Sequence, residues 1–182
     1  MRFFVPLFLL FISLAPALAQ PAPKLPAGNL PWSASRPLTG ADFRGRPAPN
    51  NGHAALTSAD INTAAHCDNG VFVGTAQASF SPSSSWVRDP AHLTPALLRH
   101  EQLHFDIAEV YARRLRQQLA ALRLPCAQLG NRFDRITQAT YAAWAAAEDA
   151  YDRDTNHGLR PTQQAQWENL VRQQLQELAA FM

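Results

Sequence analysis

Two histidines stand four positions apart in the segment Leu97-Leu98-Arg99-His100-Glu101-Gln102-Leu103-His104. On a helix, side chains at this spacing share a face. Thr94 followed by Pro95 is a typical helix start, with a capping hydroxyl and proline at the first helical position. No further Pro or Gly occurs before Pro125. The sequence therefore predicts a long helix over about residues 95–123.

The two histidines lie on the apolar side of this predicted helix. At about 100° per residue, several apolar side chains fall within roughly 60° of His100, namely Leu97, Ile107, Tyr111, Leu115 and Leu122. His-Glu-x-x-His is the zinc-peptidase pattern, in which two neutral imidazoles bind Zn²⁺ and the Glu takes a proton from water. The competing interpretation is a pair of hydrogen-bonded core histidines, which is costly beside a buried carboxylate. We expect one Zn²⁺ per chain.

A catalytic zinc needs a third protein ligand. The extended metzincin spacing requires His at position 110, where this chain has Val110. His157, at the end of a second predicted helix, is the first choice. The carboxylate alternatives are Glu148 and Asp152, whereas His53, His66 and His92 are weaker candidates.

Further roles follow if this zinc site exists. Glu101 would act as general base. Tyr151 is a candidate oxyanion donor, and three aspartates are candidates for orienting the ligating imidazoles, namely Asp106, Asp152 and Asp154.

Strand patterns precede the helical ones. Residues 54–63 read as one strand and residues 71–80 as the best strand, with Asp68-Asn69-Gly70 as a hairpin turn between them. Trp86-Val87 adds a short strand. Helices are expected over residues 131–155 and from Pro161 onward. This order indicates an α+β fold, a small antiparallel sheet followed by three long helices. The strand at residues 71–80 is also a candidate for pairing with an extended peptide at a sheet edge.

Residues 1–19 read as a secretory signal peptide. Arg2 precedes an apolar run from Phe3 to Leu14, and Ala17-Leu18-Ala19 is a small-x-small cleavage site. An uncleaved anchor is the alternative. We expect residues 20–31 to be a Pro/Ala-rich lead-in and residues 32–182 to be a single domain, periplasmic or secreted, without stable membrane insertion after cleavage.

Cys67 and Cys126 are the only cysteines. An even count in an exported chain favours a disulfide. The net charge is only +2, and acidic and basic residues alternate, which gives no indication of nucleic-acid binding. Oligomeric state is not indicated.

The chain resembles the bacterial predicted secreted Zn-dependent proteases catalogued as domain of unknown function 922. The resemblance rests on four groups of residues, namely Arg36-Pro37-Leu38-Thr39 with Asp42-Phe43-Arg44-Gly45, Ala55-Leu56-Thr57, His100 to Glu109 with Ala112-Arg113, and Tyr151-Asp152, Thr155 and His157-Gly158 with Trp167 after them. This resemblance implies a zincin-like zinc protease acting on peptide or protein substrates.

The sequence therefore leaves three alternative hypotheses for the function. The first is a zinc metallopeptidase with His100, His104 and His157 as ligands. The second is a non-catalytic envelope protein with a structural zinc. The third is a zinc hydrolase that acts on cell-wall amides.

Overall fold

The computed structural model describes residues 22–49 and 52–182, so the expected signal peptide lies outside the described residues. Within these residues the chain forms five strands followed by three α-helices, the α+β order that the sequence predicts. The strands are β1 (Leu30–Pro31), β2 (Ala55–Leu56), β3 (Ala59–Asp68), β4 (Val71–Phe80) and β5 (Trp86–Val87). The helices are α1 (Pro95–Leu122), α2 (Arg132–Thr155) and α3 (Pro161–Glu177).

The main sheet is a long hairpin with a short third strand. β3 and β4 pair antiparallel over their whole length, from Ala59 opposite Phe80 to Asp68 opposite Val71. Asn69 and Gly70 form the turn with φ of 48° and 80°, the left-handed geometry that a two-residue hairpin needs. The strand order is β1-β4-β3.

β4 is consequently the middle strand, and this contradicts the sheet-edge role suggested for residues 71–80. The backbone edge of β4 that faces away from β3 already makes hydrogen bonds at several positions along the strand. Phe72 N donates to Leu124 O, and Trp32 N donates to Ala78 O. Arg116 Nη1 donates to Ala76 O.

The stretch 54–63 is two strands rather than the single predicted one. β2 pairs with β5 in a separate small sheet, and β3 begins only at Ala59. The break falls at Ser58, whose backbone N donates to Ser85 Oγ at 2.9 Å and whose carbonyl accepts from Ser81 N at 2.8 Å. These two bonds turn the chain from one sheet into the other.

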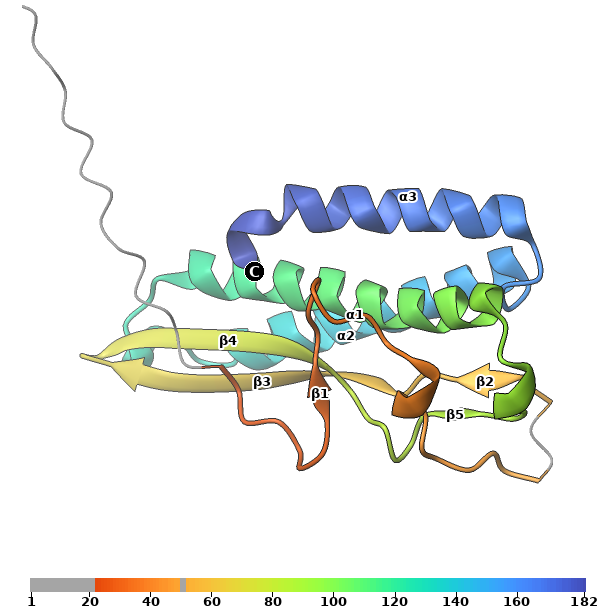
Figure 1. Ribbon diagram of the computed structural model, residues 1–182. Coiled ribbons are helices and arrows are strands. Elements are labelled where there is room, and N and C mark those ends of the chain that lie inside the picture. The colour runs from red at the N-terminus through yellow and green to blue at the C-terminus, as the bar shows by residue number, and fades with distance from the viewer. Residues whose placement is uncertain (1–21, 50–51) are drawn as a thin grey trace, which may run out of the picture.

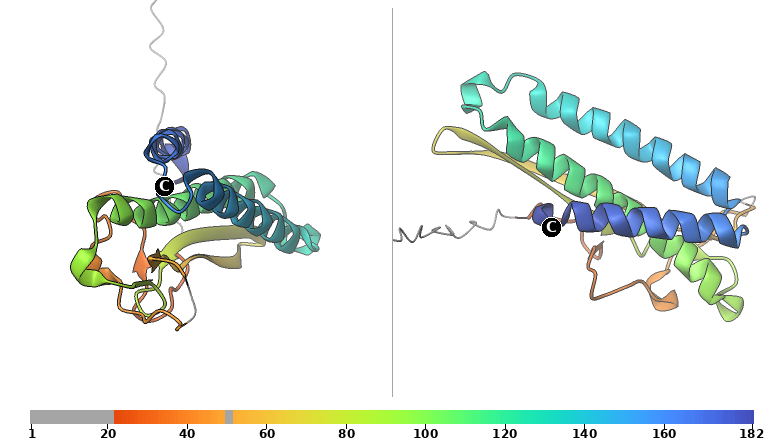
Figure 2. Two further views of the ribbon diagram at one scale, coloured as in Figure 1. Left: turned by 90° about the vertical axis from the view of Figure 1, so that its right-hand side faces the viewer. Right: turned by 90° about the horizontal axis from the view of Figure 1, so that it is seen from above.

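Helix α1 lies at the centre of the molecule, where it packs against the sheet and against both α2 and α3 (Figure 1). Helix α2 lies beside α1 and also contacts the sheet, since the Tyr141 hydroxyl donates to Ile61 O at 2.5 Å. Thr94 caps it as predicted, since Thr94 Oγ1 accepts from Leu97 N at 3.1 Å. One apolar cluster joins α1 to the sheet through residues such as Phe80 and Phe105. A second joins α1 to α2 and α3 around Tyr151. Figure 2 shows α3 lying along α1 on the side away from the sheet.

The folded part begins earlier than the predicted boundary at Trp32. Leu30 and Pro31, expected in the lead-in, form β1 against Phe80 and Ser79. Trp32 Nε1 then donates to Asp106 Oδ1 of α1 at 2.8 Å. The N-terminal segment is therefore held both to the sheet and to the central helix.

The predicted disulfide is present. Cys67 of β3 is bonded to Cys126, just after α1, with the two Cα atoms 6.2 Å apart. The disulfide joins the turn end of the β3–β4 hairpin to the segment that follows α1. Among the described residues, no helix has the length and apolar character needed to cross a membrane.

Candidate metal centre

His100 and His104 face the C-terminal end of α2. Their Nε2 atoms lie 3.3 Å apart, and Asp152 Oδ1 lies 3.2 Å from each of them. His100 is 3% exposed, so the cluster is buried at its base. Ligand atoms about 2.1 Å from a tetrahedral zinc lie about 3.4 Å from one another. The three donor atoms therefore already have the mutual spacing of a tetrahedral zinc site.

The other ring nitrogen of His104 is hydrogen-bonded to a carboxylate. His104 Nδ1 lies 2.5 Å from Glu148 Oε2, and Glu148 Oε1 accepts from Trp144 Nε1 at 2.6 Å. An ionised carboxylate only accepts hydrogen bonds, so His104 Nδ1 is the donor. Neutral His104 then presents an unprotonated Nε2 to the cluster.

The outer nitrogen of His100 faces an amide from α3. His100 Nδ1 lies 3.3 Å from Gln164 Oε1, which also accepts from the Tyr151 hydroxyl at 2.8 Å. The orientation of this amide is fixed, because Gln164 Nε2 donates to Glu168 Oε1 at 3.1 Å. Nδ1 of His100 is therefore the donor, and Nε2 again carries the lone pair.

When both imidazoles are neutral, His100 Nε2, His104 Nε2 and Asp152 Oδ1 are all hydrogen-bond acceptors, and none of them carries a hydrogen to donate to the others. Asp152 Oδ1 is a buried atom without a hydrogen-bond partner. Such an arrangement is costly unless a positive charge lies among the acceptors. Histidine nitrogens and a carboxylate oxygen are ordinary zinc ligands, so the donor set and its orphaned oxygen fit a divalent metal.

The pKa shifts of His104 and Asp152 also indicate that a positive charge is favoured within the cluster. Burial lowers the pKa of His104, but Asp152 and Glu148 outweigh it and raise the pKa to about 10. Burial raises the pKa of Asp152, but His100 and His104 outweigh it and hold the pKa far below its usual value. In the absence of a metal, a proton therefore neutralises the cluster.

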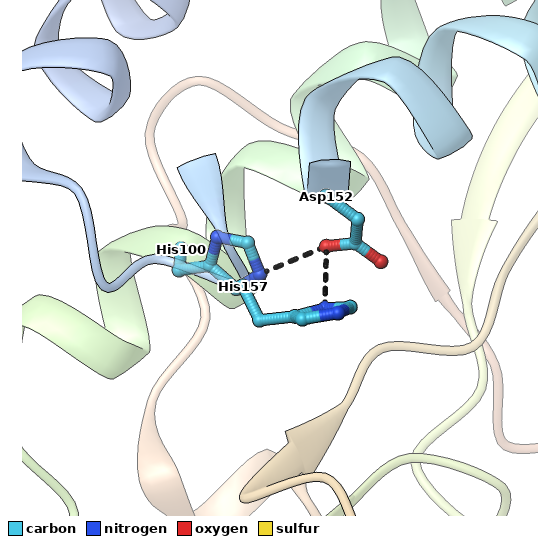
Figure 3. A group of neighbouring side chains, drawn as sticks. All are labelled: His100, Asp152 and His157. Carbon is cyan, nitrogen blue, oxygen red and sulfur yellow. Dashed lines mark ion pairs between the residues drawn. The ribbon is translucent and has the colours of Figure 1, made fainter. Parts of the chain in front are cut away.

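His157 joins the same cluster from the turn after α2. Its Nδ1 lies 3.4 Å from Asp152 Oδ1, and its side chain is half exposed. The donor atoms of His100, Asp152 and His157 all lie within 4.8 Å of one another. Figure 3 shows the Asp152 oxygen between the two rings. The cluster thus holds His157, the predicted ligand, together with Asp152, its carboxylate alternative.

The turn that carries His157 has an unusual backbone. Asn156, His157 and Gly158 have consecutive positive φ values of 49°, 54° and 79°. Gly158 has a second constraint, since a Cβ there would lie 3.0 Å from His100 Cγ. The Asn-His-Gly sequence therefore permits the left-handed turn and its close packing against the first imidazole.

Glu101 is buried beside the cluster, at the wall of a cavity of about 800 Å³. Thr57 Oγ1 lies 2.7 Å from Glu101 Oε2 and donates to it. The cavity is also lined by all four members of the cluster, His100, His104, Asp152 and His157. The segment from Gly52 to Ala59 also lines it. A substrate in this cavity would contact both the carboxylate and the candidate metal ligands.

Three of the predicted supporting roles do not agree with the structure. Tyr151 is fully buried, and its hydroxyl donates to Gln164 and lies 3.2 Å from His100 O, so it does not face the cavity as an oxyanion donor would. Asp106 accepts from Trp32 and Gln102 instead of an imidazole.

Asp154 accepts from Trp167 Nε1 at 3.2 Å, so it does not orient a candidate ligand either. Asp152 was predicted both as a carboxylate alternative to His157 and as an orienting group. Its Oδ1 lies among the imidazole nitrogens, the position of a ligand. Glu148, the other alternative ligand, takes the orienting position on His104.

The three weaker histidine candidates lie in different places. His53 lines the cavity, and its ring centroid lies 4.8 Å from that of His157. His66 is on β3 opposite Val73. His92 pairs with Asp89 at 2.8 Å on the exposed surface. Sequence reasoning missed Gln164 and Thr57, because each reaches the site from a segment 44 or more positions away.

Fold and site together define an α+β protein with a candidate metal centre on its central helix. Residues 32–158 match the family described as "Bacterial protein of unknown function (DUF922)", and the chain belongs to this family. No curated protein and no solved structure matches the chain.

Proposed function

We propose that this protein is an exported zinc metallopeptidase that hydrolyses peptide bonds in the cavity beside α1. The observation that carries this proposal is the convergence of His100 Nε2, His104 Nε2 and the orphaned Asp152 Oδ1, with Glu101 on the wall of the same cavity. Export is supported by the signal-like sequence of residues 1–19.

His100, His104 and Asp152 would hold the metal as three protein ligands and leave a fourth position open for water, while His157 stays at the rim of the cavity. A bound Zn²⁺ would supply a Lewis acid that polarises a peptide carbonyl and acidifies water. The Glu101 carboxylate accepts a proton from the attacking water and passes it to the leaving amine as the C–N bond breaks. Thr57 holds one carboxylate oxygen of Glu101 by its hydrogen bond and so orients the base.

The test is hydrolysis of unfolded casein by the purified protein, with and without a chelator, beside the variant Glu101→Gln. We expect the chelator and the variant each to abolish activity, while Glu101→Gln retains its zinc. Glu177→Gln makes the same chemical change at an exposed position of α3 and should leave activity unchanged. Equal hydrolysis in all samples would remove the peptidase proposal.

A second candidate function has its own observation. If His157 binds together with His100, His104 and Asp152, four protein donors close the shell and leave no position for water, as in structural zinc sites. Stoichiometric zinc without any hydrolysis, and with Glu101→Gln indistinguishable from wild type, would favour this non-catalytic envelope protein.

A parallel incubation with two substrates distinguishes a general peptidase from a cell-wall hydrolase. Casein and purified peptidoglycan present peptide bonds and cell-wall amides to the same enzyme sample. Release of fragments from peptidoglycan alone would favour the cell-wall hydrolase over the general peptidase.

A further inference from the structure

Helix α3 supplies a polar group to the candidate metal centre although it lies beyond residues 32–158, the part of the chain that matches the family. Gln164 is 7% exposed and is the buried polar residue of this helix. Its Oε1 faces His100 Nδ1 at 3.3 Å across 64 positions of sequence. Core packing alone does not explain why a buried amide oxygen faces the ring nitrogen of a candidate metal ligand.

The direction of every hydrogen bond around this amide is determined by its outer partner. The Glu168 carboxylate only accepts, so the atom of Gln164 that faces it is Nε2. Oε1 is then the atom on the other side, where it accepts from Tyr151 and from His100.

We infer that Gln164 is a positioning residue that holds His100 in the tautomer with a proton on Nδ1 and a free Nε2. This inference rests on the proposed zinc site and names a residue that tunes it. Tyr151 contributes in two ways, because its hydroxyl donates to the same oxygen and its ring stacks on His100 with centroids 4.7 Å apart. Outer partners of this kind typically change metal affinity by about 10-fold to 100-fold when removed.

Three variants test the inference by zinc affinity, measured in competition with a chelating dye. Gln164→Leu removes the acceptor and should weaken zinc binding about 10-fold to 100-fold. The double variant Gln164→Glu, Glu168→Gln keeps an acceptor for His100 Nδ1 and exchanges donor and acceptor between positions 164 and 168, so it should restore binding to within a few-fold of wild type. Gln166→Leu makes the same change at an exposed position of α3 and should bind zinc as wild type does.

A second measurement reads the tautomer itself. Long-range ¹H–¹⁵N spectra of the imidazole rings in the wild-type protein should show His100 protonated at Nδ1. A proton on Nε2 of His100 in the zinc-free protein at high pH would overturn the inference, even if Gln164→Leu fails to fold. Equal zinc affinity of Gln164→Leu and wild type would also overturn it and leave the proposed function intact. Absence of zinc binding by wild type would instead overturn the proposed function together with the inference.

Discussion

Under the proposed function, removal of zinc should lower the thermal stability by an amount that depends on Asp152. The candidate ligands come from α1, from the end of α2 and from the turn after it, so the unfolded chain does not bring them together. Zinc would therefore bind the folded state preferentially and stabilise it by mass action. At free zinc 100-fold above the dissociation constant, this stabilisation is about 2.7 kcal/mol.

That free energy converts into a measurable shift. For a chain of 150 to 250 residues, about 1 kcal/mol corresponds to roughly 2 to 4 °C, so zinc should raise Tm by about 5 to 11 °C. In Asp152→Ala, a 100-fold loss of affinity leaves about 0.4 kcal/mol at the same zinc concentration, or roughly 1 to 2 °C.

Differential scanning calorimetry of chelator-treated protein, titrated with zinc, measures both shifts. Asp149→Ala removes an exposed carboxylate of the same helix and should keep the wild-type response. The reasoning is refuted if wild type shows no zinc-dependent shift, or if Asp152→Ala responds to zinc as fully as wild type does.

Three other predictions concern separate parts of the molecule. The double variant Cys67→Ala, Cys126→Ala opens a loop of 59 residues, which should cost about 4 kcal/mol and lower Tm by roughly 8 to 16 °C, without a change in zinc affinity measured by dye competition. Burial raises the pKa of Asp42, but hydrogen bonds from Arg36 and Thr39 outweigh it and lower the pKa. Asp42→Asn should therefore lower the free energy of unfolding, measured in urea, by about 1 kcal/mol above pH 3.8. This difference should shrink as the pH falls through the folded-state pKa of Asp42, which lies below 3.8. A difference that stays constant with pH would contradict the prediction. Thr57→Val should lower kcat on casein about tenfold with zinc content unchanged, because Glu101 loses its hydrogen bond, and an unaltered kcat would show that this bond does not orient the base.

Features set by neighbouring residues could be predicted from the sequence. The cap at Thr94, the hairpin turn at Asn69-Gly70 and the shared face of His100 and His104 depend on backbone rules that act within about four positions. The disulfide was also predicted, because the signal-like sequence of residues 1–19 favoured a disulfide and two cysteines allow only one pairing.

Features set by docking between distant segments could not be predicted. Whether Asp152 or His157 lies nearer to the two imidazoles depends on how far α2 extends along α1 before it ends. Asp106 illustrates the same limit, because its angle on α1 excluded it as a ligand, but nothing in the sequence showed that Trp32 would occupy its carboxylate. The break between β2 and β3 likewise depends on Ser81 and Ser85, more than 20 positions away.

The Cys67–Cys126 disulfide lies just past the C-terminal end of α1, and the cluster of His100, His104 and Asp152 lies near its N-terminal end, so α1 is held to its neighbours at both ends. A helix of 28 residues is about 42 Å long, so local opening at one end need not disturb the other. A reductant would therefore free the hairpin tip first. Removal of zinc from the proposed site would instead free the tail of α2, while α3 stays held to α1 by Arg113, which donates to Leu175 O, and by the apolar cluster around Val171. Limited proteolysis of the purified protein, with a reductant in one sample and a chelator in the other, should therefore cut different segments.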